Sequence, residues 1–233
     1  MKVDDAVETI SRFFNDLIGS LVPGAVLAVG LAVMHLGPGK IVEMSKALDS
    51  AALALIVVGL VFAAGHALMA GFEVALQRLL RACQVVNAFD EAEAKRRQSF
   101  EFFAEIVNKL RGDDASGAAA KWAYNDLRNV ALSVSAEGAS LGRRFMFISL
   151  LCNGVATALM IILVDFLCCL AFGQKLLFPY DLAPIWFVQS ALMLVAATAL
   201  FKRGEAFYAR AMTTPFSVAV AELKLKRESN VAK

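Results

Sequence analysis

Two long segments without a formal charge constrain this chain more than any other feature of its sequence. The first runs from Leu17 to Leu36, and the second runs from Ala51 to Phe72 with His66 as its only ionisable residue. An α-helix rises about 1.5 Å per residue, so about 20 apolar residues cross the roughly 30 Å of hydrocarbon in a bilayer. Both segments therefore predict transmembrane helices.

Two further apolar segments follow later in the chain. The third runs from Phe145 to about Cys169 and is interrupted by Asn153 and Asp165, and the fourth covers Ala183–Phe201. Of the 233 residues, 59% are apolar and 19% are charged, which is more apolar surface than a soluble domain of this length hides in a core. We expect an all-α, polytopic helical membrane protein with four transmembrane helices and a small helical cytoplasmic segment between the second and third.

Lysine and arginine predict the orientation of the spans, because basic residues near span ends stay on the cytoplasmic side. If both termini and the central segment lie together, their side holds 20 of the 23 Lys and Arg residues and the other side holds 3. Both termini are therefore expected in the cytoplasm. Six basic residues beside span ends are the expected anchors at the inner membrane surface: Arg78, Arg81, Arg143, Arg144, Lys202 and Arg203.

The expected domain organisation follows from these spans. The parts are an amphipathic N-terminus with the first two spans, a cytoplasmic helical segment, the third and fourth spans, and a C-terminal helix with a tail: residues 1–72, 73–144, 145–201 and 202–233. The first 16 residues carry four acids and no basic leader, which does not predict a cleaved signal peptide.

Apolar residues at helical spacing predict short helices in the central segment. The first of them continues the second span as a stalk, and the second ends at Gly112. The segment from Gly138 to Gly142 is interpreted as a flexible approach to the third span. Thr214 and Pro215 predict the start of a new C-terminal helix, since proline is favoured in a first helical turn.

Small residues recur at four-residue spacing in the first two spans. Small side chains on one helix face let two backbones approach closely, and in lipid this packing drives helix association. The pattern predicts helix interfaces within the chain or between copies, formed by Ser20, Gly24, Ala28 and Ala32 and by Gly59, Ala63, Ala67 and Gly71.

Five polar residues within the spans are candidates for a pore or another functional site: His66, Asn153, Thr157, Asp165 and Gln189. A polar group in hydrocarbon is costly unless it is hydrogen-bonded, so each either serves a function or contacts another helix. The number of residues between each polar residue and the end of its span gives its depth in the membrane. Residues at similar depth are expected to pair, which predicts contacts of Asn153 with His66 and of His35 with Asp165. One chain lacks the polar lining of a wide pore, although an oligomer that repeats these residues around an axis would line a narrow one.

Several classes of function are not supported by the sequence. The chain has two histidines and no zinc-protease, nucleophile-elbow or phosphate-loop motif, so we expect no enzyme, no metal and no cofactor. A net charge of +2, with both signs spread over several segments, does not predict a nucleic-acid partner. The four cysteines lack C-x-x-C spacing and are interpreted as thiols in apolar surroundings.

Four stretches carry a resemblance in layout. They are SLVPGAVLAVG in the first span, GHALMAG in the second, RRFMFISLLCNGVATAL at the start of the third and FKRGEAFYARAMTTPF after the fourth. In this layout the chain resembles small four-span bacterial inner-membrane proteins, some of which are encoded beside anti-phage systems. The resemblance implies a bacterial inner-membrane effector that oligomerises and perturbs the envelope when a cytoplasmic partner signals, and it assigns no functional residue.

The expected function is an oligomeric, channel-like or membrane-perturbing effector that is controlled through its cytoplasmic helices by a protein or ligand, with a role in anti-phage defence. The expected partners are the lipid bilayer and further copies of the chain. Two alternatives stay open. One is a structural or scaffolding subunit of a larger membrane complex, and the other is a small proton-coupled transporter in which His66 and Asp165 bind protons or substrate.

Overall fold

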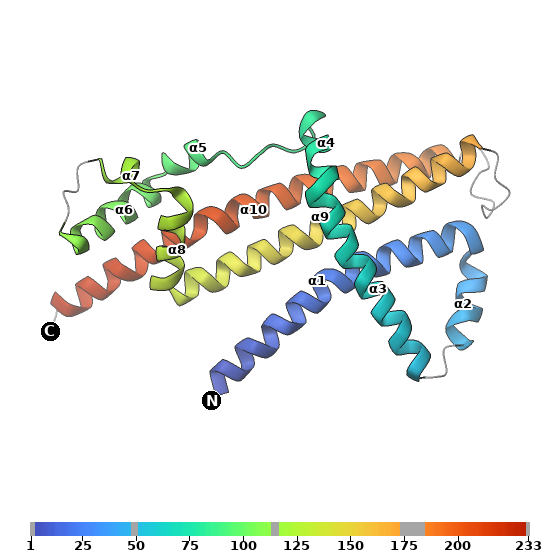
Figure 1. Ribbon diagram of the computed structural model, residues 1–233, viewed down its shortest axis with the longest axis horizontal. Helices are drawn as coiled ribbons and strands as arrows, with labels where there is room; N and C mark the ends of the chain where they lie inside the picture. The colour runs from blue at the N-terminus through green and yellow to red at the C-terminus, as the bar shows by residue number, and fades with distance from the viewer. Residues whose placement is uncertain (1–2, 48–50, 113–116, 173–184, 232–233) are drawn as a thin grey trace. The chain divides into compact units, whose positions relative to one another are not determined.

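The described chain is helical. The structure, a computed structural model, describes residues 3–47, 51–112, 117–172 and 185–231, and these ranges contain helices and no strand (Figure 1). The all-α prediction is thereby confirmed. Three helical segments within these ranges are long and apolar enough to cross a membrane: Leu17–Leu36, Ala51–Ala82 and Ala136–Ala171. The fourth predicted span, Ala183–Phe201, begins outside the described residues, and its described part is not among the three.

The chain divides into two compact units. The first comprises Met1–Asn87 and Phe147–Gly204, and the second comprises Ala88–Met146 and Glu205–Lys233. Two helices, α9 (Ala136–Ala171) and α10 (Ile185–Val231), contribute residues to both units. The other elements of the first unit are α1 (Val3–Leu36), α2 (Pro38–Ala47), α3 (Ala51–Gly71), the π-helix η1 (Phe72–Leu76) and α4 (Gln77–Ala82). Those of the second unit are α5 (Glu91–Lys95), α6 (Gln98–Arg111), α7 (Ala118–Lys121) and α8 (Tyr124–Val134).

The second predicted span continues beyond its apolar part. Helices α3, η1 and α4 follow one another without a break from Ala51 to Ala82, which confirms that the helix of the second span continues beyond Phe72. The stalk belongs to the first unit, because its buried residues Phe72 and Leu80 pack with Phe201 of α10. The rings of Phe72 and Phe201 stack with their centroids 5.7 Å apart.

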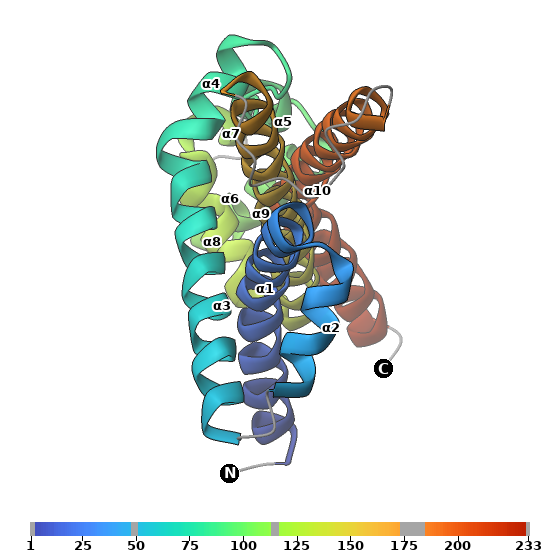
Figure 2. The same cartoon turned by 90° about the vertical axis from the view of Figure 1, so that its right-hand side faces the viewer.

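Helices α1 and α3 are in contact and cross each other in the view of Figure 1, and Figure 2 shows the same pair from the side. At their contact a methyl group added to Gly24 would collide with the carbonyl oxygen of Val61, and one added to Gly65 would collide with the carbonyl oxygen of Ser20. Two backbones that approach this closely leave room only for glycine at both positions. The α1–α3 packing is therefore set by a glycine on each helix.

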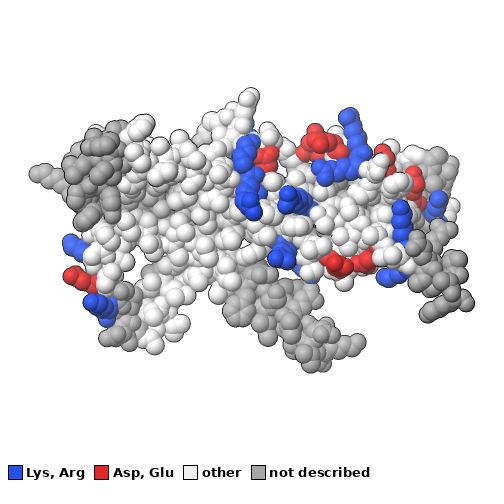
Figure 3. All heavy atoms as spheres, turned by 180° about the vertical axis from the view of Figure 1, so that it is seen from behind, with Lys and Arg blue, Asp and Glu red and all other residues white. Residues whose placement is uncertain are grey.

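The first unit presents apolar side chains outward. On the face drawn in Figure 3, Lys, Arg, Asp and Glu are sparse over its long helices, whereas they are frequent over the elements of the second unit. Leu55 and Leu60 of α3 are 72% and 67% exposed, and Leu192 and Val195 of α10 are 65% and 66% exposed. Large exposed leucine and valine side chains of this number are typical of a lipid-facing surface.

The second unit has an aromatic core. Phe100, Phe103, Tyr124 and Phe216 are each at most 1% exposed. The rings of Phe100 and Tyr124 stack at 5.4 Å between centroids, and Phe216 meets Phe100 edge-on at 5.1 Å. Helix α6, which contributes Phe100 and Phe103, ends where Gly112 adopts a positive φ of 80°, as predicted.

The predicted new helix at Thr214 is wrong, because α10 continues through Pro215. A proline inside a helix leaves the carbonyl four residues earlier without its donor and costs about 3 kcal/mol or more. Here Arg128 Nη2 donates to that carbonyl, Ala211 O, at 3.4 Å, and Tyr124 Oη donates to Met212 O at 3.0 Å. Helix α8 thus supplies, through Arg128, a replacement donor for the carbonyl that Pro215 leaves free, and Tyr124 adds a further hydrogen bond in the same turn.

The flexible approach predicted at Gly138–Gly142 is also wrong, because these residues lie in the first turns of α9. Ser135 precedes the helix, and its Oγ accepts a hydrogen bond of 2.8 Å from Gly138 N, which is N-terminal capping. Gly142 is buried against Pro215, where an added methyl group would lie 3.3 Å from Cγ. The two glycines serve close helix packing inside the second unit.

Candidate functional site

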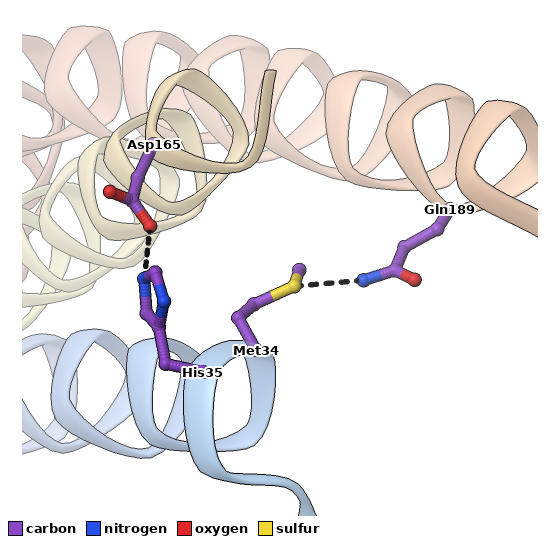
Figure 4. A network of polar contacts seen from close by, with 4 residues as sticks. All are labelled: Met34, His35, Asp165 and Gln189. Carbon is purple, nitrogen blue, oxygen red and sulfur yellow. Dashed lines mark hydrogen bonds and ion pairs between the residues drawn. The ribbon is translucent and has the colours of Figure 1, made fainter. Parts of the chain in front are cut away.

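The clearest polar cluster of the first unit joins the ends of three helices. His35 Nε2 lies 2.7 Å from Asp165 Oδ2, and Gln189 Nε2 donates to Met34 Sδ at 3.2 Å (Figure 4). The His35 and Asp165 side chains are 28% and 35% exposed. The predicted pairing of His35 with Asp165 is confirmed, whereas the contact of Gln189 with Met34 was not anticipated because thioether sulfur is a weak acceptor.

Local sequence places His35 at this point. Helix α1 ends at Leu36 because Gly37 follows with a φ of 80° and donates its N–H to Val33 O at 3.2 Å. His35 is consequently in the last turn of α1. Asp165 projects from α9 in the turn before Cys169.

Cys169 completes a group of three donors with His35 and Asp165. One ligand atom from each side chain lies within 4.8 Å of the ligand atoms of the other two. Asp165 and Cys169 share one face of α9 because they are four residues apart. Sequence reasoning paired only His35 with Asp165, since nothing in the spacing of cysteines indicates that Cys169 meets a histidine of another helix.

His66 has a different partner from the one predicted. Its Nε2 lies 3.2 Å from Ser20 Oγ, and its ring meets Phe62 edge-on at 4.5 Å between centroids. The sequence predicts Ser20 only as a small residue of a packing face. In the structure its hydroxyl also forms the hydrogen bond between α1 and α3. The pairing of His66 with Asn153 is therefore wrong.

Asn153 and Thr157 form contacts inside the α9–α10 packing. Asn153 lies so close to Gly204 that a methyl group there would collide with Asn153 Oδ1. Thr157 Oγ1 donates to the carbonyl of Asn153 within α9 at 2.7 Å. Neither residue lines the apolar groove of about 490 Å³ between α1, α9 and α10, whose walls include Val29, Val33 and Ile162.

The two predicted small-residue faces differ in what they contact. Ser20 and Gly24 lie at the α1–α3 contact, whereas Ala28 is exposed and Ala32 is half-buried. On α3 the contact is made by Gly65 and not by the predicted face. All four residues of that face are exposed, and nothing lies within 4 Å of a methyl group added to either glycine: Gly59, Ala63, Ala67 and Gly71.

The six predicted anchors are all exposed. Four belong to the first unit and two to the second: Arg78, Arg81, Lys202 and Arg203, and Arg143 and Arg144. Long basic side chains in such positions reach water or lipid phosphate from an apolar helix end.

The second unit has its own buried polar contacts. Trp122 Nε1 donates to Asn108 Oδ1 at 2.9 Å, and Ser135 Oγ donates to Glu222 Oε1 at 2.6 Å. Burial raises the pKa of Tyr124 from 10.0 to about 12, with smaller opposing effects from Arg128 and Arg97. Tyr124 therefore stays protonated and donates its hydrogen bond to Met212 O.

Comparisons with protein-family models, with curated proteins and with solved structures found no match for this chain.

Proposed function

We propose that this chain is a four-span protein of a bacterial inner membrane, with both termini in the cytoplasm, that assembles with further copies and acts as a channel-like or membrane-perturbing effector. The membrane location is supported by three helices that are long and apolar enough to cross a bilayer. The distribution of 20 basic residues against 3 supports the orientation.

The first part of α10 supports a fourth span. Its large apolar side chains are half to two-thirds exposed: Phe187, Val188, Leu192, Leu194 and Val195. In water this surface would be an aggregation site, whereas in a bilayer it faces lipid. With four spans, the connection between the second and third spans lies on the same side of the membrane as both termini. The stalk and the second unit would therefore be on that side.

One observation carries the proposal of assembly, namely the exposed face of α3 formed by Gly59, Ala63, Ala67 and Gly71. Only 11% of the most apolar window of Ala51–Ala82 is buried, against 39% for Ala136–Ala171. Because small residues gain packing only when another helix lies against them, this face favours a helix of a second copy over lipid.

A conducting path requires more than one chain. Asn153 and Thr157 are engaged within α9 and against α10, and Gln189 contacts Met34. His66 is exposed and lies beside Ala67 on α3, so assembly through this helix brings imidazoles to the interface between copies. A narrow path lined by a few repeated polar groups is consistent with this arrangement.

The second unit is proposed to regulate the assembly by binding a cytoplasmic protein or ligand. Helices α9 and α10 contribute residues to both units, so a change in the packing of the second unit alters helices that also belong to the membrane unit. A role in anti-phage defence is part of the same proposal and rests on the resemblance in layout.

The test compares two double variants in lipid nanodiscs and in liposomes. Gly59→Leu with Ala63→Leu adds bulk to the exposed α3 face, and Val57→Leu with Val58→Leu adds bulk at neighbouring exposed positions of the same helix. We expect the wild type and the control to form one oligomer and to release ions, and the first variant to lose both properties. An oligomer that leaves ion and dye gradients intact, with and without added activators, contradicts the channel.

The same exposed face would also accept a helix of another integral protein, which is the scaffolding alternative. Co-purification of other integral subunits with a monomeric chain would favour it.

In the transporter alternative His66 and Asp165 bind protons or substrate, and each would do so beside a different part of α1. Their α1 partners, Ser20 and His35, are 15 residues apart, or about 22 Å along the helix.

A further inference from the structure

The donor group of His35, Asp165 and Cys169 has the composition of a transition-metal site. It combines an imidazole, a carboxylate and a thiol, which are the three side-chain types that bind zinc in proteins. Calcium and magnesium require more ligands and prefer oxygen alone. The presence of sulfur therefore selects borderline and soft ions such as Zn²⁺ and excludes the hard cations.

The helices bring these donors together without any change of backbone. His35 comes from the last turn of α1, and Asp165 and Cys169 come from successive turns of α9. Tetrahedral ligands on zinc lie about 3.3–3.7 Å apart, given bonds of about 2.0–2.3 Å. All three ligand atoms lie within 4.8 Å of one another and the His35–Asp165 distance is 2.7 Å, so each separation is within about an ångström of this range. Side-chain rotation closes such a difference.

We propose that His35 Nε2, an Asp165 carboxylate oxygen and Cys169 Sγ bind one Zn²⁺ ion that links α1 to α9. On binding, the Cys169 thiol releases its proton to solvent and its sulfur bonds to the ion. His35 gives up the Nε2 proton that it donates to Asp165, carries its remaining proton on Nδ1, and bonds to zinc through Nε2. Three protein ligands leave a fourth position for water or another small ligand. The proposal rests on the first unit alone and stands independently of the proposed function.

The neighbouring cysteine provides a matched control. Cys168 and Cys169 are both free, but Cys168 is exposed and projects from another side of α9, outside the donor group. A site formed by the two adjacent thiols would need both residues, whereas the proposed site needs only Cys169.

The experiment titrates Co²⁺, a spectroscopic substitute for Zn²⁺, into the metal-free full-length protein in nanodiscs. We expect one ion per chain, with visible bands of tetrahedral cobalt and a near-ultraviolet band from sulfur-to-cobalt charge transfer, all displaced by Zn²⁺. The sulfur band should vanish in Cys169→Ser and persist in Cys168→Ser. His35→Gln and Asp165→Asn should each weaken binding by at least about tenfold, since even an outer partner of a metal ligand costs that much.

A second measurement uses only the wild-type protein, in case a variant does not fold. Zn²⁺ should slow alkylation of Cys169 and leave that of Cys168 unchanged, as read by fragmentation mass spectrometry of the tryptic peptide that carries both thiols. Equal protection of both thiols, loss of the sulfur band in Cys168→Ser, or cobalt binding that does not saturate at one ion per chain would overturn the proposal.

Discussion

The helices of the two units pack against one another through different kinds of residue. In the first unit α1 carries Pro23 and α9 carries Gly154, where a methyl group would lie 2.7 Å from the proline ring. In the second unit Gly142 likewise packs against Pro215, but most of the core consists of large aromatic side chains such as Phe100, Tyr124 and Phe216. The first unit gains contact by bringing backbones together, and the second gains it by burying large side chains. This difference agrees with the proposed placement of the first unit in lipid and the second in water. Burial of leucine and phenylalanine is favourable in water but gains little in lipid.

The largest effect is expected from removing an aromatic ring of the second unit. Phe216→Ala removes a side chain that is 1% exposed and contacts Phe100, Phe103 and Tyr124. A buried Phe→Ala substitution costs about 3–5 kcal/mol, so the second unit should unfold well before the first. The measurement is thermal unfolding followed by Trp122 fluorescence in a Trp186→Phe background.

The matched control is Phe102→Ala, since Phe102 is 45% exposed on the same helix as Phe103. It should change stability by about 0.5 kcal/mol or less. If both substitutions lower the melting temperature equally, the aromatic core does not hold the second unit together.

The next effect tests backbone contact in the first unit. Gly65→Ala places a methyl group against the carbonyl oxygen of Ser20 and should destabilise the α1–α3 packing by about 1–3 kcal/mol. Gly59→Ala on the same helix meets nothing within 4 Å and should leave stability unchanged or slightly higher. Melting temperatures in detergent distinguish the two, and equal losses would contradict the observed packing face.

The residues of α3 show how far the sequence predicts this structure. The length of its uncharged segment predicts α3 as a helix, and the 3.6-residue period of apolar residues after it predicts the continuation, which ends at Ala82 although the period runs on to Val86. Neither feature fixes the packed face, because glycines and alanines occur on several sides of α3. Gly65 makes the contact only because Gly24 of α1 lies directly opposite it where the two helices meet. Which face of α3 packs against α1 depends on the residues of both helices, so the sequence of one helix alone does not predict it.

The same limit applies to prolines and polar partners. Pro215 predicts a helix start unless another helix supplies a donor to Ala211 O, and in this structure that donor is Arg128 of α8. Depth along the spans was sufficient to pair His35 with Asp165, because both lie near span ends. It was insufficient for His66, since depth gives no information on the rotation of a helix about its axis.

A smaller effect is expected from Tyr124, and it depends on pH. Burial raises the pKa of Tyr124 to about 12 in the folded chain, above the ordinary value of 10.0. Its contribution to stability is therefore complete below pH 10 and is lost as the pH rises toward about 12. Tyr124→Phe removes the hydrogen bond to Met212 O, which costs about 1 kcal/mol at neutral pH, and it also removes this alkaline decline.

The measurement is unfolding of the second unit at pH 8 and at intervals up to pH 12 for both proteins. The difference between wild type and Tyr124→Phe should shrink as the pH rises. A constant difference would mean that Tyr124 is not the group whose ionisation weakens the unit.

The smallest expected effect comes from the hydrogen bond between Ser20 and His66. Interhelical hydrogen bonds in membranes contribute about 0.6 kcal/mol on average, so Ser20→Ala alone should lower detergent stability only slightly. A double-mutant cycle with His66→Leu isolates the contact, and its coupling energy should be about 0.6 kcal/mol. The cycle of His66→Leu with Asn153→Ala should be additive, because Asn153 packs against Gly204 instead. Coupling in the second cycle and none in the first would restore the partner that span depth predicted and would require α3 to rotate about its axis.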